Sequence, residues 1–283
     1  MPEGDTIFRA ARTLNRALAG FRITKFETVF PKLSRVNVDQ PIVGRTIESV
    51  RAEGKWLLMR FSGGLTLLTH MLMSGSWHIY RVGEKWRMPH SSMRVMLSTE
   101  MFVAVAFNIQ IAEFHTDDSL RRRAGFSALG PSLLAADFDQ AEAISRLKSH
   151  PAMQVGDALL KQSIMAGIGN VFKSEIAFAC NVNPFRKVST LTANEVQCLV
   201  TTALKFLRAN VTDASGDQIV TYTGMRRTTS RANPEQRLWV YKRSGEPCRR
   251  CGKAIESRKQ GMDARITFWC PNCQPDGDSE SET

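Results

Sequence analysis

Cys248-Arg249-Arg250-Cys251 is followed, after eighteen residues, by Cys270-Pro271-Asn272-Cys273. Two thiolate pairs at this spacing are the ligand set of a tetrahedral structural zinc ion, and they leave no coordination position open for catalysis. Residues 264–269, between the pairs, have the composition of a β-strand, which predicts a small zinc-bound hairpin. The chain has six cysteines in all, and we expect the other two to be free thiols, because the sequence otherwise indicates a cytosolic protein.

The opposite end of the chain reads Met1-Pro2-Glu3-Gly4-Asp5-Thr6. Because proline is small, we expect the initiator methionine to be removed, which leaves a free prolyl amine. The pKa of an α-amino group is about 7.7–8.0, so part of it is neutral at cellular pH and can attack an electrophilic carbon. The carboxylate of Glu3 is next to it and could transfer protons. A simpler interpretation is that Pro2 and Glu3 only begin a helix, since both residue types suit a first turn.

The overall composition indicates a basic protein with ordinary apolar cores. The net charge is +11, hydrophobic residues make up 43%, and residues 276–283 carry four acids and no base. Such an excess of positive charge favours a polyanionic partner, most simply nucleic acid, although a basic protein without that partner would have the same balance. No run reaches the roughly 18 apolar residues of a membrane span, and no signal segment opens the chain, so we expect a cytoplasmic protein.

The first half of the chain changes from a helical to a β pattern. Apolar residues recur at helical spacing from Ile7 to Leu18, and Gly20 follows as a stop signal. Ser62-Gly63-Gly64 then separates two apolar runs, which predicts a hairpin. The expected strands cover residues 56–61, 65–71, 94–97, 101–107 and 109–114. We therefore predict one helix packed on a β-sandwich over residues 2 to about 125.

The second half of the chain is mainly helical in pattern. Asp139 with Glu142, and Thr192 with Glu195, have the spacing of a helix N-cap and its reciprocal acid. Apolar helical periodicity covers residues 155–162, 170–180 and 193–209, so residues from about 130 to 225 are expected to form a helical domain. Residues 126–138 would be the link, and residues 276–283 a disordered acidic tail.

Ala166-Gly167-Ile168-Gly169-Asn170 lies between two of these helical patterns. The glycines permit a tight turn, and Asn170 could cap the helix that follows. The free N–H groups of a helix N-terminus bind phosphate well. A plain turn between two helices would have the same composition.

Four motifs now stand in one order along the chain, and together they resemble the formamidopyrimidine-DNA glycosylase and endonuclease VIII family of base-excision repair enzymes. The motifs are Pro2-Glu3-Gly4, Gly54-Lys55, residues 166–170 and the four-cysteine finger. The resemblance extends from Pro2 to Gln274, and the opening residues are closest to the bacterial endonuclease VIII branch. It implies an α+β multidomain fold: a β-sandwich domain (1–125), a linker and helix–two-turn–helix domain (126–225), and a lesion-side loop with the zinc finger (226–275).

The resemblance also implies a reaction. Pro2 would attack C1′ of a damaged nucleotide, expel the oxidised base and form a cationic iminium, after which β- and δ-elimination remove the 3′ and 5′ phosphates. Glu3 would act as general acid and base at the sugar, and the damaged base would first leave the helix. Oxidised pyrimidines are the expected substrates, and oxidised purines are the close alternative. The partner would be double-stranded DNA, and nothing calls for more than a monomer.

By the same resemblance, Lys55 would join Pro2 and Glu3 as a catalytic residue. Lys55, Asn170 and Arg265 would also hold phosphates near the lesion, contacts that fix position without reading sequence. Met73, in the stretch 70–77, would fill the space left by the extruded base, although a methionine at the end of a strand could equally be part of the core. We expect His70 to be structural rather than catalytic.

The chain departs from the family pattern in several places. Thr6 stands where many relatives have a second carboxylate, and residues 118–123 match the wedge loop of the formamidopyrimidine branch poorly. Residues 226–237 are a candidate for the loop that covers the flipped base, and no residue can be assigned to read the opposite base.

Two other functions share the basic charge and the finger. A non-catalytic zinc-finger protein could bind damaged DNA through the same surface without needing an exposed Pro2, so retention of Met1 would favour it. An RNA-binding protein is a third possibility, but the sequence suggests no aromatic platform for stacking bases.

Overall fold

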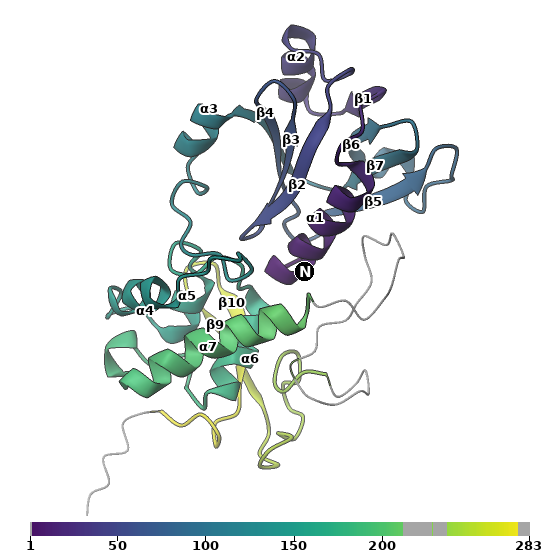
Figure 1. Ribbon diagram of the computed structural model, residues 1–283. Coiled ribbons are helices and arrows are strands. Elements are labelled where there is room, and N and C mark those ends of the chain that lie inside the picture. Colours follow the sequence, from purple (N-terminus) through teal and green to yellow (C-terminus); the bar gives the residue numbers. More distant parts are fainter. Residues whose placement is uncertain (1, 212–227, 229–236, 277–283) are drawn as a thin grey trace, which may run out of the picture. The chain divides into compact units, whose positions relative to one another are not determined.

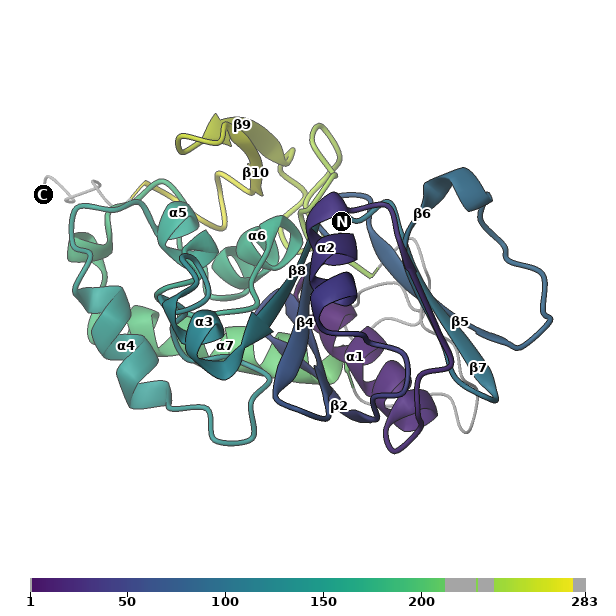
Figure 2. The same ribbon diagram turned by 90° about the horizontal axis from the view of Figure 1, so that it is seen from above.

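The computed structural model describes residues 2–211, residue 228 and residues 237–276 (Figures 1 and 2). These residues form two compact units, the first ending at Ala128 and the second beginning at Leu129. We call them unit 1 and unit 2 and describe each by itself. Within the described part of the chain, no helix has the length and apolar character needed to span a membrane.

Unit 1 consists of two four-stranded antiparallel sheets and the helix α1 (Gly4–Leu18). The first sheet has the order β2-β3-β4-β8, with β2 Ile47–Glu53, β3 Trp56–Phe61, β4 Leu65–His70 and β8 Ile111–Thr116. The second has the order β1-β6-β7-β5, with β1 Lys25–Thr28, β6 Met93–Ser98, β7 Phe102–Phe107 and β5 Ser76–Arg81. The short helices are α2 Pro31–Asp39, η1 His90–Ser92 and α3 Asp117–Arg122.

The core of unit 1 explains why the sequence predicts the strands of this unit. Both sheets and α1 contribute to one apolar cluster, which includes Leu14, Leu67 and Trp77. Each fully buried side chain of this size contributes about 1.5–3 kcal/mol relative to an exposed one. The predicted helix, the hairpin at Ser62-Gly63-Gly64 and the sandwich are confirmed. The sequence pattern did not predict α2, η1, α3, β1, β2 and β5; α2, for example, buries only Leu33.

Unit 2 consists of helices and one hairpin. The helices are α4 Gln140–Lys148, α5 Val155–Leu160, α6 Asn170–Ala179, η2 Val188–Thr190 and α7 Ala193–Ala209, and the hairpin strands are β9 Glu256–Gln260 and β10 Arg265–Trp269. Both predicted caps are present. The Asp139 carboxylate accepts from Glu142 N at 2.9 Å, and Thr192 and Glu195 form a full capping box.

Two details of unit 2 correct the sequence analysis. The N-cap of α6 is Gly169 and not Asn170, which is the first helical residue and turns its side chain toward β10 instead. Cys180 and Cys198 are not free thiols but form a disulfide, because the end of α6 and the middle of α7 bring their Cα atoms to 5.8 Å.

Candidate active site and nucleic-acid interface

The strand register of unit 1 determines which loops leave the sandwich at the same end. In the first sheet, Trp56 pairs with His70, and His70 pairs with Ile111. The loops next to these residues are 54–55, 71–75 and 108–110, and the last two connect the first sheet with the second. They lie at one end of the unit, which we call the loop edge. The predicted residues Lys55 and Met73 are therefore on the same edge.

The N-terminus reaches this edge because α1 runs antiparallel to β2. Gly20 N donates to Ile47 O at 2.8 Å, and Val50 N donates to the Asn15 side chain at 2.7 Å. From Asn15 back to Glu3 the helix covers about 18 Å, at about 1.5 Å per residue. From Val50 on to Lys55 the strand covers about 17 Å, at about 3.3 Å per residue. Glu3 and Lys55 therefore arrive at the same end of the unit; the N label in Figure 1 marks this end at the start of α1.

The first turn of α1 carries two buried carboxylates. Glu3 is the N-cap residue; its backbone oxygen accepts from Thr6 N and Ile7 N, and its buried side chain does not cap the helix. Asp5 is also buried, 3.6 Å from the Arg9 guanidinium, and accepts from the Thr6 hydroxyl at 3.4 Å. The helix dipole stabilises negative charge at this end. Pro2 is thus both the residue before a helix start and the neighbour of acidic groups.

Met73 is at the tip of a tight turn. Gly75 N donates to Met71 O at 2.8 Å, and a side chain at Gly75 would collide with that oxygen. Met71 is the core methionine of this loop, with 2% of its surface exposed, whereas 64% of Met73 is exposed. The geometry therefore favours the void-filling hypothesis for Met73 over the core alternative.

His70 has structural partners on the same edge. Its Nδ1 accepts from Leu72 N at 3.0 Å, and its ring packs edge-on against Trp56 at 4.7 Å. Burial, assisted by the charges of Lys55 and Arg123, lowers the pKa of His70 to about 4. The ring is therefore neutral at pH 7, which agrees with a structural role.

Arg123 is a residue near Lys55 that the sequence analysis did not single out. Its guanidinium lies 4.1 Å from the Trp56 ring and binds Glu113 with both branches, at 2.8 and 3.2 Å. The Arg123 hydrogen bond, followed by that of His115, lowers the pKa of Glu113 to about 2. Residues 118–123, which match the wedge loop poorly, thus include an arginine that packs on Trp56, the first residue of β3, and most of these residues belong to α3.

In unit 2, the start of α6 is joined to the zinc hairpin by side-chain hydrogen bonds. Asn170 Nδ2 donates to Ile266 O at 2.8 Å, Lys173 Nζ to Thr267 Oγ1 at 2.5 Å, and Phe268 N to Ser174 Oγ at 3.4 Å. This ladder places Asn170 beside the start of β10, where the half-exposed Arg265 lies 3.7 Å from Asp263. Asn170 Oδ1 is buried and has no hydrogen-bond partner within the described residues. The two predicted phosphate contacts of this unit are thus neighbours.

The four predicted metal ligands meet in one cluster. The sulfur atoms of Cys248, Cys251, Cys270 and Cys273 all lie within 4.8 Å of one another. Bonds of about 2.3 Å in a tetrahedron place the sulfurs about 3.8 Å apart. The distances of 3.9 Å (Cys248–Cys273) and 3.5 Å (Cys251–Cys270) fit one zinc ion.

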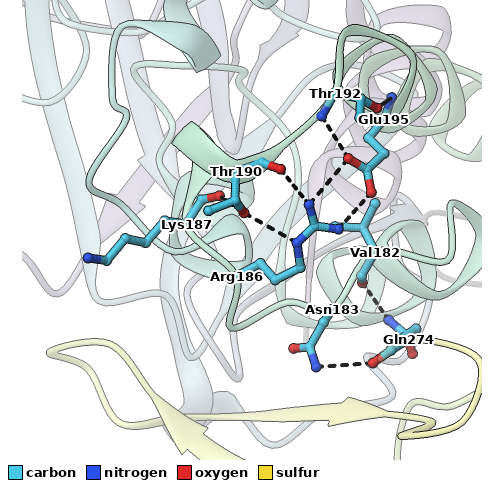
Figure 3. Close-up of polar contacts among 8 residues, drawn as sticks. All are labelled: Val182, Asn183, Arg186, Lys187, Thr190, Thr192, Glu195 and Gln274. Atoms are coloured by element: carbon cyan, nitrogen blue, oxygen red, sulfur yellow. Dashed lines mark hydrogen bonds and ion pairs between the residues drawn. The ribbon is translucent and has the colours of Figure 1, made fainter. Parts of the chain in front are cut away.

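Gln274 connects this zinc site to the helices. Its side chain accepts from Cys270 N at 2.9 Å and donates to Val182 O at 2.8 Å. Its backbone oxygen accepts from Asn183 Nδ2 at 3.0 Å, and Figure 3 shows this bond and the bond to Val182. Figure 3 also shows that Arg186 fixes the connection between α6 and α7, with an ion pair of 2.7 Å to Glu195. No sequence pattern predicted these contacts.

Glu175 is a buried carboxylate that binds backbone groups more than 60 residues away in the sequence. It accepts from the backbone N–H groups of residues 239–241 at 2.8–2.9 Å and from the Thr228 hydroxyl. Burial raises the pKa of Glu175, and these hydrogen bonds oppose that shift. The candidate covering loop, residues 226–237, lies outside the described residues except for Thr228 and Arg237.

The two sheets, the helices of unit 2 and the four-cysteine hairpin together define a fold that solved structures share. A crystal structure of Lactococcus lactis Fpg with DNA that contains an abasic site matches with a TM-score of 0.81, over 97% of this chain and 100% of that chain, at 20% identity. At this identity the likeness concerns the fold.

Family models then divide the chain in order. Residues 1–110 match the formamidopyrimidine-DNA glycosylase N-terminal domain, residues 129–221 its H2TH domain, and residues 245–275 the zinc finger found in FPG and IleRS. The chain belongs to the formamidopyrimidine-DNA glycosylase and endonuclease VIII family. It is 39% identical to a Streptomyces coelicolor protein named "Probable endonuclease 8 2", over 97% of this chain and 94% of that protein. It is 34% identical to a Mycolicibacterium smegmatis protein named "DNA-(apurinic or apyrimidinic site) lyase Nei2", over 97% and 99%.

Proposed function

We propose that this chain is a bifunctional DNA glycosylase and AP lyase of base-excision repair. The observation that carries the proposal is the convergence of Pro2, Glu3, Lys55 and Met73 on the loop edge of unit 1. The relatives named endonuclease 8 and DNA-(apurinic or apyrimidinic site) lyase support the same activity. We further propose oxidised pyrimidines as the main substrates, and the bacterial cytosol, at the chromosome, as the place of action.

Each residue then has one task. The Pro2 nitrogen bonds to C1′, the bond from C1′ to the base breaks, and its electron pair leaves with the base. The Pro2 nitrogen loses its proton, and Glu3 gives a proton to O4′ as the C1′–O4′ bond of the sugar ring breaks, which leaves a cationic iminium between Pro2 and C1′. The iminium withdraws electrons, so that loss of the C2′ proton expels the 3′ phosphate. Lys55 holds a phosphate beside the reacting sugar, while Asn170 and Arg265 hold others. The zinc ion is structural, because four thiolates fill its coordination sphere.

Borohydride trapping tests this proposal. Duplexes with an abasic site, thymine glycol, dihydrouracil or 8-oxoguanine are incubated with the enzyme and reductant, and the adduct is mapped by mass spectrometry. We expect an adduct at Pro2, and the order of trapping ranks pyrimidine against purine lesions. A matched variant that retains Met1 should bind the duplexes and give no adduct. If the mature protein gives none either, while it still binds DNA, it is a non-catalytic binding protein.

A further inference from the structure

A column of aromatic rings covers the outer face of the second sheet in unit 1. Its members are His78, Tyr80, Trp86 and His90. Successive ring centroids are 6.2, 6.3 and 4.1 Å apart, and the interplanar angles are only 19°, 26° and 23°. The last pair, Trp86 and His90, is at direct stacking distance. The loop between β5 and β6 therefore folds back so that its rings continue a stack that begins on the sheet.

The column is rigid at its base and open at its tip. Tyr80 is buried, and its hydroxyl accepts from Arg87 N at 3.1 Å and bonds His78 Nδ1 at 3.3 Å. Trp86 is half-buried and packs edge-on against Phe107 at 5.7 Å. His90 is exposed. One face of the His90 ring stacks on the Trp86 indole, which Phe107 holds in place. The His90 side chain would therefore lose little conformational entropy on binding a ligand.

The tip of the column lies on the loop edge. Ser76 and Met93 both pair with Phe107, so the chain before each of them leaves the second sheet at that end. Asn108 N donates to Ser92 O at 2.9 Å, which joins η1 to the loop 108–110. A side chain at Gly75 would touch Ile109, so the Met73 loop is the next neighbour. His90 thus shares an edge with Lys55, Met73 and the N-terminus.

The charge around the tip suits a nucleic acid strand. Residues 81–94 hold four basic side chains and one acid, Glu84, whose carboxylate accepts from Arg81 N at 2.9 Å. Arg94 is fixed beside His90, because its guanidinium donates to Ser91 O and Met93 O at 2.9 Å each. Aromatic faces combined with basic side chains are the usual means of holding unpaired bases, and stacking works with any base.

We propose that His90, supported by Trp86, stacks on an unpaired nucleobase of DNA at the loop edge, with Arg87 and Arg94 attracting the adjoining phosphates. The inference rests on the proposed function only in taking DNA as the partner. A base within an intact duplex has both faces covered by its neighbours, so the contact favours single-stranded DNA.

The test uses the full-length, zinc-loaded protein and compares His90→Ala with His90→Phe, which keeps a ring. Val82→Ala, at an exposed position in the same loop, is the matched control. Affinity for a fluorescein-labelled oligothymidine and for an undamaged duplex of equal length is measured by anisotropy. We expect His90→Ala to weaken single-strand binding about tenfold, within the range for the loss of one stacked base, and to leave duplex binding unchanged. His90→Phe and Val82→Ala should bind like the parent protein.

Three results would overturn the inference: no change in His90→Ala, an equal loss on single strand and duplex, or the same loss in His90→Phe, which would point to charge. Borohydride trapping on an abasic duplex is run in parallel and should give an adduct with the parent protein and with Val82→Ala. Absence of trapping in every variant would refute the proposed function but would leave the comparison between single strand and duplex decisive for His90.

Discussion

The two units hold their candidate DNA contacts by different means. In unit 1, the register of apolar strands delivers Lys55 and Met73 to one edge, and α1 delivers Pro2 and Glu3 to the same end. In unit 2, Asn170 and Arg265 are brought together by buried hydrogen bonds between α6 and β10 and by a metal site. Apolar packing tolerates small adjustments, whereas a buried polar contact loses most of its value when one partner is displaced. We therefore expect the two units to respond differently to the same kind of damage.

The largest difference should follow zinc removal. Structural zinc supplies about 10–16 kcal/mol in isolated fingers, and here Gln274 links the metal site to the helices. We expect chelation, or Cys270→Ala, to abolish hydrogen-exchange protection in β9, β10 and the start of α6, while α1 and the sandwich keep theirs. Lys148→Ala, at an exposed position of α4 in the same unit, is the control. Equal loss of protection in both units would contradict the comparison.

A core truncation should produce the opposite pattern. Leu67 lies in β4 with no exposed surface, so Leu67→Ala should cost unit 1 about 2–5 kcal/mol. Denaturant unfolding measures the cost, and zinc content reports on unit 2, which should stay loaded. The matched variant Leu147→Ala, in the core of unit 2, should lower the stability of that unit instead. Zinc loss in Leu67→Ala would show that the units do not respond separately.

A pH effect of intermediate size should be confined to unit 1. The folded state lowers the pKa of His70 from about 6.5 to about 4, so between these values the unfolded chain binds more protons. Above pH 6.5 His70 does not lower the free energy of unfolding. Its protonation in the unfolded chain lowers that free energy as the pH falls from 6.5 toward 4, and the loss is constant below pH 4. The total is up to about 3 kcal/mol, at about 1.4 kcal/mol per pH unit. The free energy of unfolding, plotted against pH, should therefore have a steeper slope for the parent than for His70→Asn between pH 4 and 6.5. Parallel plots would refute the buried neutral imidazole.

The smallest effect should be that of Arg265→Ala, because this side chain is half-exposed. We expect a uniform loss of affinity for DNA of any sequence, below about tenfold, and a decrease of about one in the slope of log Kd against log salt. Lys148→Ala, an exposed cation at the end of α4, should change neither quantity. A loss restricted to one lesion would show that Arg265 reads the damage rather than the backbone.

The same contrast explains what the sequence could predict. The period of apolar residues is a local signal, so α1, the β3–β4 hairpin and the capping box of α7 were all correct. The zinc ligands were correct because the metal imposes their spacing. The prediction that Asn170 caps α6 was wrong, because its side chain donates a hydrogen bond to a residue of β10, 96 positions away in the sequence. The disulfide and the contacts of Glu175 and Gln274 also join distant residues, and no local pattern encodes such pairs.

Gln274 has one more consequence, which concerns the order in which the chain is made. Its bond to Val182 spans 92 residues, and it follows the last zinc ligand directly. Domains generally fold as units during synthesis, the N-terminal one first. The described residues of unit 1 have all been made once Ala128 has left the ribosome, but unit 2 waits for nearly the last residues of the chain. On the proposed mechanism, a nascent or prematurely terminated chain would therefore carry the candidate nucleophile Pro2 before its zinc finger is complete.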